Sequence, residues 1–148
     1  MQNNTLSHFE GTIVRILELK DVTESELCEP IREEKWSIRE IVGHMYSWDQ
    51  YNLEQMVPNM SEGNALPPFP DHDEFNESAM SQLENVPVDE IIETFVRTRK
   101  KLIQYLMDLG DVRFTIGKGK RQFSPESFIK IFLKHDQHHL KQIEEKLS

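Results

Sequence analysis

Apolar residues recur at helical spacing in four separate segments of this 148-residue chain, and this pattern is the strongest constraint on its fold. The segments cover residues 6–20, 36–57, 87–110 and 124–148. Each segment presents one apolar stripe, which a stable protein has to cover with another element. Four such helices with little strand signal predict an all-α protein, a four-helix bundle.

Capping residues predict where these helices begin and end. Ser37, with a glutamate three residues later, has the pattern of a capping box, and Pro58 is expected to stop the helix that Ser37 begins. Ser124 followed by Pro125 predicts the start of the last helix. Gly110 is expected to provide a left-handed cap at the end of the third helix.

The connections between the helices differ greatly in length. Residues 58–86 begin with a proline-rich loop, and residues 73–84 have a pattern that allows a short helix. After the third helix, residues 112–123 alternate around a Gly-Lys-Gly turn. We therefore expect a long crossover between the second and third helices, and a short hairpin-like loop before the fourth, within a single domain over residues 1–148.

Three of the six histidines lie close together in the last predicted helix. At about 100° per residue, His135 and His139 fall on the apolar stripe, whereas His138 turns toward the lysine-rich side and is expected at the surface. Two histidines four residues apart on a helix can reach one metal ion. The same spacing also fits a pair of histidines with no metal, on a helix surface or in a core.

A metal ion bound by this pair needs a further ligand from another helix. His44, at the edge of the apolar stripe of the second predicted helix, is the candidate, whereas His8 and His72 are assigned no role. Three neutral imidazoles leave open positions on the ion, which is the arrangement of a catalytic site. The donor set suits zinc or nickel, so the sequence predicts a divalent metal ion as cofactor.

Two sequence stretches carry a resemblance to a known family. The stretch KWSIREIVGHMYSWD is followed about 90 residues later by FLKHDQHHLKQI, and together they resemble the DinB/YfiT-like superfamily of metal-binding four-helix bundles. The resemblance implies that His44, His135 and His139 hold the metal. It also implies activities found in that family, which contains thiol transferases that use bacillithiol or mycothiol, metal-dependent hydrolases and damage-induced proteins. Homodimers are common in the family.

Charged residues fall on three of the apolar stripes. Asp49, Arg99 and Asp136 occupy such positions in the second, third and fourth predicted helices. A lone buried charge is costly, so we expect Arg99 and Asp136 to pair, or either of them to pair with Asp49. A carboxylate there could instead orient a histidine ligand, and these three residues are candidates for supporting catalysis. Alternatively, the helix ends splay and the charges reach solvent.

Further residues are candidates for contact with a substrate or cofactor. Trp48, Tyr51 and Gln55 lie near His44 on the second predicted helix and are expected to line a pocket, although core packing is an alternative for Trp48. The net charge is −9, but residues 97–134 carry +7 and the remainder −16. The basic stretch is either a set of solvated helix faces or a rim that attracts an anionic cofactor.

The resemblance, together with the predicted three-histidine site, favours an enzyme: a metal-dependent, thiol-dependent S-transferase that acts on small electrophiles. Cys28 is the single cysteine and lies outside the four helices, so the thiol is expected from a low-molecular-weight cofactor such as bacillithiol. The alternatives are a metal-dependent hydrolase and a non-catalytic small-molecule-binding or stress-response module. The net acidity argues against nucleic acid, and no segment resembles a membrane span or secretory signal. We therefore expect a cytoplasmic homodimer with a small-molecule substrate.

Overall fold

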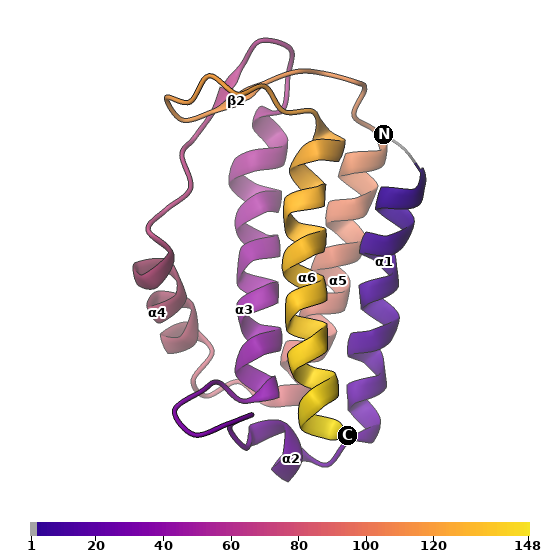
Figure 1. The fold of residues 1–148 in the computed structure, drawn as a ribbon, viewed down its shortest axis with the longest axis vertical. Helices are drawn as coiled ribbons and strands as arrows, with labels where there is room; N and C mark the ends of the chain where they lie inside the picture. Colours follow the sequence, from indigo (N-terminus) through magenta and orange to yellow (C-terminus); the bar gives the residue numbers. More distant parts are fainter. Residues whose placement is uncertain (1–2) are drawn as a thin grey trace.

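Four long helices packed side by side form the body of the protein in the computed structural model, which describes residues 3–148 (Figure 1). They are α1 (Asn3–Leu17), α3 (Ile38–Tyr51), α5 (Val88–Met107) and α6 (Pro125–Leu147). The predicted all-α four-helix bundle is confirmed. Residues 1–2, which belong to the predicted domain, lie outside the described residues.

The long crossover follows from the direction of the helices. α3 and α5 run the same way, so the chain has to return along the bundle between them (Figure 1). The crossover contains β1 (Ala65–Leu66) and α4 (His72–Gln82), which packs on α3. The short helix that the pattern of residues 73–84 allows is therefore present, over His72–Gln82. β1 pairs in parallel with β2 (Thr115–Ile116), which ties the crossover to the loop before α6.

The loop before α6 is hairpin-like, as predicted. Phe114 and Phe123 exchange two backbone hydrogen bonds of 3.0 and 2.8 Å. Gly117 lies in the turn between them with φ of +57°, a conformation that favours glycine. A Cβ on Gly117 would also lie 3.1 Å from Cβ of Pro68, so glycine lets the loop approach the crossover closely.

Short helical elements complete the connections, and they are η1 (Glu18–Asp21), α2 (Glu24–Cys28), η2 (Asn52–Met56) and η3 (Val57–Asn59). Cys28 ends α2 and is exposed, so it lies outside the four long helices as expected. None of the helices in the described part of the chain has the length and hydropathy needed to cross a bilayer.

The predicted caps fix the beginnings of α3 and α6. The Ser37 side chain accepts a 3.1 Å hydrogen bond from the backbone N–H of Glu40, whose carboxylate accepts one from the N–H of Ser37. The Ser124 side chain accepts a 3.1 Å bond from the N–H of Ser127. These bonds satisfy helix N–H groups that would otherwise lack partners, so both helices begin at defined residues.

The ends of α3 and α5 differ from the prediction. The second helix was expected to continue to about residue 57, but α3 ends at Tyr51 and the chain widens into a π turn, η2, because the ring of Pro58 disrupts a regular helix in the preceding turn. The predicted left-handed cap at Gly110 is wrong. Asp108 and Leu109 donate backbone hydrogen bonds to carbonyls three residues back, so α5 tightens and ends without a glycine.

One buried arginine contacts all four long helices. Arg99 of α5 bonds both carboxylate oxygens of Asp49 on α3, at 2.7 and 3.1 Å, and both of Asp136 on α6, at the same distances. Its fifth N–H bonds the carbonyl of Phe9 on α1 at 3.0 Å, and Thr12 of α1 donates to Asp136. All five guanidinium donors are therefore used. The predicted pairing is confirmed, and the alternative of solvated helix ends is wrong.

The charges in this group stabilise one another. Burial alone would lower the pKa of Arg99, but the charges of Asp49 and Asp136 outweigh burial and raise this pKa, so the guanidinium stays charged. Burial raises the pKa of Asp49 to about 6, and the charge of Arg99 acts against this rise. At neutral pH the group therefore holds an ionised Asp49 against a permanent cation.

Replacing Arg99 by methionine should lower the free energy of unfolding by about 3–5 kcal/mol, because two buried carboxylates lose their partner. Urea unfolding followed by circular dichroism measures this change. Arg97→Met, on an exposed position of the same helix, is the matched control and should change stability by less than about 0.5 kcal/mol. A loss at Arg99 no larger than in this control would show that the buried group contributes little.

Candidate metal centre

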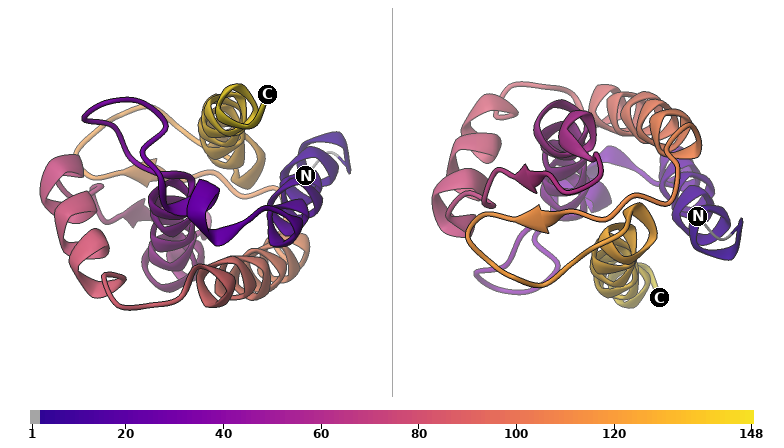
Figure 2. Two further views of the ribbon diagram at one scale, coloured as in Figure 1. Left: turned by 90° about the horizontal axis from the view of Figure 1, so that it is seen from below. Right: turned by 90° about the horizontal axis from the view of Figure 1, so that it is seen from above.

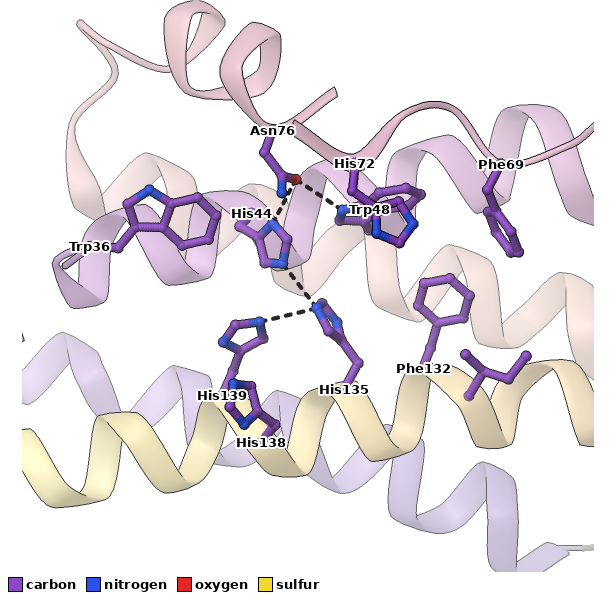
Figure 3. A pocket seen from close by; sticks show the side chains of 11 residues that line it. Trp36, His44, Trp48, Phe69, His72, Asn76, Phe132, His135, His138 and His139 are labelled. Atoms are coloured by element: carbon purple, nitrogen blue, oxygen red, sulfur yellow. Dashed lines mark hydrogen bonds between the residues drawn. The ribbon is translucent and has the colours of Figure 1, made fainter. Parts of the chain in front are cut away.

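Three histidines from two helices converge between α3 and α6 (Figure 3). His44 comes from α3, and His135 and His139 come from adjacent turns of α6. Nε2 of His135 lies 2.9 Å from Nε2 of His44 and 3.1 Å from Nε2 of His139. Each histidine offers a ring nitrogen within 4.8 Å of the others, which is close enough for one ion to be shared among them.

The helical period of α6 decides which of its histidines faces inward. His139 is 6% exposed and His135 is half-buried, whereas His138 is exposed. The face angles expected from a regular helix therefore place these three residues correctly. His8 is exposed on α1 and lies outside the cluster, as expected.

An amide from the crossover fixes the tautomer of His44. Oδ1 of Asn76 on α4 lies 3.1 Å from Nδ1 of His44 and 3.2 Å from Nε1 of Trp48 (Figure 3). An indole N–H can only donate, so the Asn76 atom that faces Trp48 is the carbonyl oxygen. The same oxygen therefore accepts from Nδ1–H of His44. As a result, Nε2 of His44 carries a lone pair that is directed into the cluster.

A second amide acts on His139 in the same way. Nδ1 of His139 lies 2.7 Å from Oε1 of Gln142, so this nitrogen is the donor and Nε2 carries the lone pair. A neutral His135 can donate its proton to only one of its two neighbours, so at least one lone pair has no donor. The orienting partners are amides rather than the carboxylate that the sequence suggested, because Asp49 and Asp136 are bonded to Arg99.

The cluster fits a divalent metal ion. Zinc bound tetrahedrally at about 2.1 Å from each imidazole keeps the nitrogens about 3.4 Å apart, only a few tenths of an ångström more than the two separations of 2.9 and 3.1 Å. All three nitrogens lie within 4.8 Å of one another, so side-chain movements of no more than about 1.5 Å would give ligand geometry. In addition, the imidazole nitrogens of the cluster have more lone pairs than N–H donors, and a bound cation would neutralise this excess of negative potential.

Burial keeps the three imidazoles neutral, which is the form that binds metal. Desolvation, followed by the proximity of His135 and His139, lowers the pKa of His44 to about 3. Desolvation and then His139 lower the pKa of His135 to about 4. The pKa of His139 is lowered as well, mainly by burial.

The cluster lies in the wall of a pocket of about 450 Å³ that is rich in aromatic rings. Trp36 lies at one end of this aromatic pocket, and Phe69 and Phe132 lie at the other (Figure 3). The lining residues are Trp36, His44, Trp48, Phe69, His72, Asn76, Ile131, Phe132, His135, His138 and His139. Of residues 3–148, no carboxylate, lysine or arginine contributes to this lining.

Only part of the predicted pocket lining is correct. Trp48 lines the aromatic pocket, but Tyr51 and Gln55 line a separate groove of about 270 Å³ between α3 and α4. The ring of Phe75 causes this separation, because it packs against both Trp48 and Tyr51, with ring centroids 4.2 and 5.7 Å away. Gln55 lies beyond Tyr51, in the π turn that follows α3.

The basic stretch does not form the rim of this pocket. Arg99 is buried in its ion-pair group, and the other basic residues between 97 and 134 are absent from the described pocket lining. Asp49, Arg99 and Asp136 do not line the pocket either. Their side chains bond one another and α1, so the structure gives them no direct access to a substrate.

Several residues of the pocket were missed by the sequence reasoning. Asn76, Phe69 and His72 come from the crossover, where no period indicates which side chains face inward. His72 was expected in a loop without a role, but it begins α4 and lines the pocket. Trp36 carried a usable signal, since it directly precedes the capping box of the helix that holds His44.

Comparison with known proteins agrees with the fold. The family model described as the DinB superfamily matches residues 8–143. YfiT from Bacillus subtilis, described as a probable metal-dependent hydrolase with an unusual four-helix bundle topology, superposes with a TM-score of 0.77 at 17% identity, covering 99% of this chain and 87% of that protein. At this identity the likeness shows the fold alone. No curated protein matches the sequence.

Removing one ligand should abolish metal binding. Protein loaded with zinc or nickel and then desalted should keep about one equivalent of metal, and His44→Ala or His139→Ala should keep less than about a tenth of that amount. Elemental analysis measures the content. His138→Ala, at the exposed neighbouring position, is the control and should retain the metal. Equal and negligible metal in every preparation would contradict the site.

The affinity for metal should persist at low pH. Three ordinary imidazoles would lose about 1000-fold in zinc affinity between about pH 7.5 and about pH 5.5, because each would be protonated below about 6.5. Here the lowered pKa values keep His44 and His135 neutral across this range, so the loss should stay below about tenfold. Competition titrations at the two pH values measure it. A loss of zinc affinity near 1000-fold would show that the three histidines have unshifted pKa values.

Proposed function

This chain belongs to the DinB superfamily, and from this membership and the convergence of His44, His135 and His139 we propose that it is a metal-dependent enzyme. A divalent ion held there would supply Lewis acidity, which lowers the pKa of a thiol or water molecule at an open coordination position. Asn76 and Gln142 hold two of the imidazoles in the tautomer that the ion requires.

The reaction that we propose is transfer of a low-molecular-weight thiol to a small electrophile. The observation that supports this reaction is a cluster of three neutral imidazoles in an aromatic pocket whose described lining has no carboxylate. A thiol, with a pKa near 8.5, loses its proton far more easily than water, with a pKa near 15.7, so thiol transfer needs no strong base on the protein. The chemistry of the lining therefore favours the thiol over water as nucleophile.

The residues of the pocket have separate roles in this proposal. Trp36, Trp48 and Phe132 exclude water and hold the apolar part of the electrophile. His72 and His138 are the imidazoles of the lining that are not ligands, and either can accept the proton that the thiol loses and pass it to solvent. The sulfur then forms a bond to the electrophilic carbon, and the leaving group departs with its electron pair.

Hydrolysis is the second candidate function. YfiT, which shares the fold, is described as a probable metal-dependent hydrolase. The same two imidazoles, His72 and His138, would serve as general bases toward a water molecule. We rank hydrolysis lower because both inward carboxylates of the bundle, Asp49 and Asp136, are bonded to Arg99 and are unable to assist.

Metal-loaded protein should catalyse the reaction of a low-molecular-weight thiol with 1-chloro-2,4-dinitrobenzene, and His44→Ala should lower the rate at least about 100-fold, because the ion is lost. Absorbance of the thioether product measures turnover, and circular dichroism checks the fold. His8→Ala, an exposed histidine of α1, should retain the wild-type rate.

Other outcomes of this assay separate the alternatives. Ester hydrolysis without added thiol, lost in His44→Ala, would favour the hydrolase over the transferase. Binding of the electrophile with no turnover under any condition would instead favour a non-catalytic module.

A further inference from the structure

A second depression borders the histidine cluster at Trp36 and His139. Its volume is about 240 Å³, and it shares Trp36 and His139 with the aromatic pocket. Another depression of about 290 Å³ shares Ile31 and Gln142 with it and follows α6 toward the C-terminus. We call these two depressions together the polar groove. It lies between the turn at residues 31–36 and the last turns of α6.

The position of this turn explains the groove. Seen from below, the segment before α3 arches outward between α4 and α6 (Figure 2, left). Trp36 ends the segment, and its ring centroid lies 4.8 Å from that of His44. Trp36 and His139 thus lie at the boundary between the aromatic pocket and the polar groove.

The aromatic pocket and the polar groove differ in chemistry. The polar groove contains five charged residues, Arg32, Glu34, Lys35, Glu145 and Lys146, beside the apolar side chains of Ile31, Trp36 and Ile41. Lys146 lies 3.8 Å from Glu29, whereas Arg32 and Lys35 are exposed and form no ion pair within residues 3–148. Glu34 and Glu145 also form no ion pair within these residues, so the groove offers free charges of both signs. Lys35 lines the depression that contains His139, and Arg32 lines the neighbouring depression. The aromatic pocket has no charged side chain in its described lining.

The turn that carries these cations is well ordered by its own bonds. Ile31 N–H donates to the carbonyl of Trp36 at 2.9 Å, and Lys35 N–H donates to the carbonyl of Arg32 at 3.0 Å. Glu34 has φ of +64°, a left-handed conformation that costs free energy in a residue other than glycine. Such strain is concentrated at ligand-binding and catalytic sites.

Gln142 connects the groove to a metal-ligand candidate. Its Oε1 accepts from His139, and its amide NH₂ group makes no hydrogen bond within the described residues. Gln142 lines both depressions of the groove, and an amide NH₂ group can donate to a carboxylate or carbonyl oxygen.

We propose that the polar groove binds the carboxylate-bearing part of the thiol substrate, while the aromatic pocket binds the electrophile. Arg32, Lys35 and the amide of Gln142 would recognise the carboxylate, and the sulfur would reach the cluster beside His139. The proposal rests on the proposed thiol transfer. It assigns the two substrates of that reaction to two depressions that meet at Trp36 and His139, so that both can be bound at once.

Cobalt(II)-loaded protein provides a binding test that needs no turnover, because a thiolate that binds cobalt gives a charge-transfer absorption band. Titrations would compare 3-mercaptopropionate, which carries a carboxylate, with neutral 2-mercaptoethanol. In the Arg32→Gln/Lys35→Gln variant, the affinity for 3-mercaptopropionate should fall about three- to tenfold, as expected for two exposed charge contacts, and that for 2-mercaptoethanol should stay unchanged.

Lys118→Gln/Lys120→Gln is the matched control, since it removes the same charge from exposed positions of the hairpin at the other end of the bundle. This control should bind both thiols as the wild type does. Unchanged affinity for 3-mercaptopropionate in the Arg32/Lys35 variant, or an equal loss for both thiols, would overturn the groove assignment and leave thiol transfer standing. Absence of the band with either thiol in wild-type protein would overturn the proposed function, and the groove assignment with it.

Discussion

The guanidinium of Arg99 is the contact on which the arrangement of the helices depends. It bonds Asp49 of α3, Asp136 of α6 and the backbone of α1 from its own position on α5, and every N–H has an acceptor. A shift of any one helix would leave a buried charge without its partner, which costs several kcal/mol. Because Asp136 directly follows His135, the same bonds set the height at which α6 presents its histidines to α3.

This use of the carboxylates shapes the chemistry of the neighbouring cluster. Asp49 and Asp136 are bonded to Arg99, and two of the three histidines, His44 and His139, are oriented by the amides of Asn76 and Gln142 instead. An amide partner fixes the tautomer without adding negative charge. A divalent ion held by three neutral imidazoles would therefore retain its full charge, which favours an anionic ligand such as a thiolate.

The helical period of the apolar residues explains which parts of the fold and of the site could be predicted from the sequence. It distinguishes the faces of a regular helix, and so it assigns His135, His139 and Asp136 to the inward side of α6, where they lie. It carries no information about irregular segments or about which helices meet. Asn76 comes from the crossover and Trp36 from a turn, so their places beside the cluster depend on tertiary packing that a periodic pattern does not report.

The bundle and the crossover contribute different residues to the site, and this affects which substitutions the protein can accept. The metal-ligand candidates lie on α3 and α6, which the Arg99 group holds in place, whereas Phe69, His72 and Asn76 enter the pocket wall from the crossover. α4 packs on the outside of α3 and takes no part in the Arg99 group. Substitutions at positions such as Phe69 can therefore alter which molecules fit the pocket without disturbing the bundle. A fold built in this way can change the molecules that its pocket admits while the three histidines keep their arrangement.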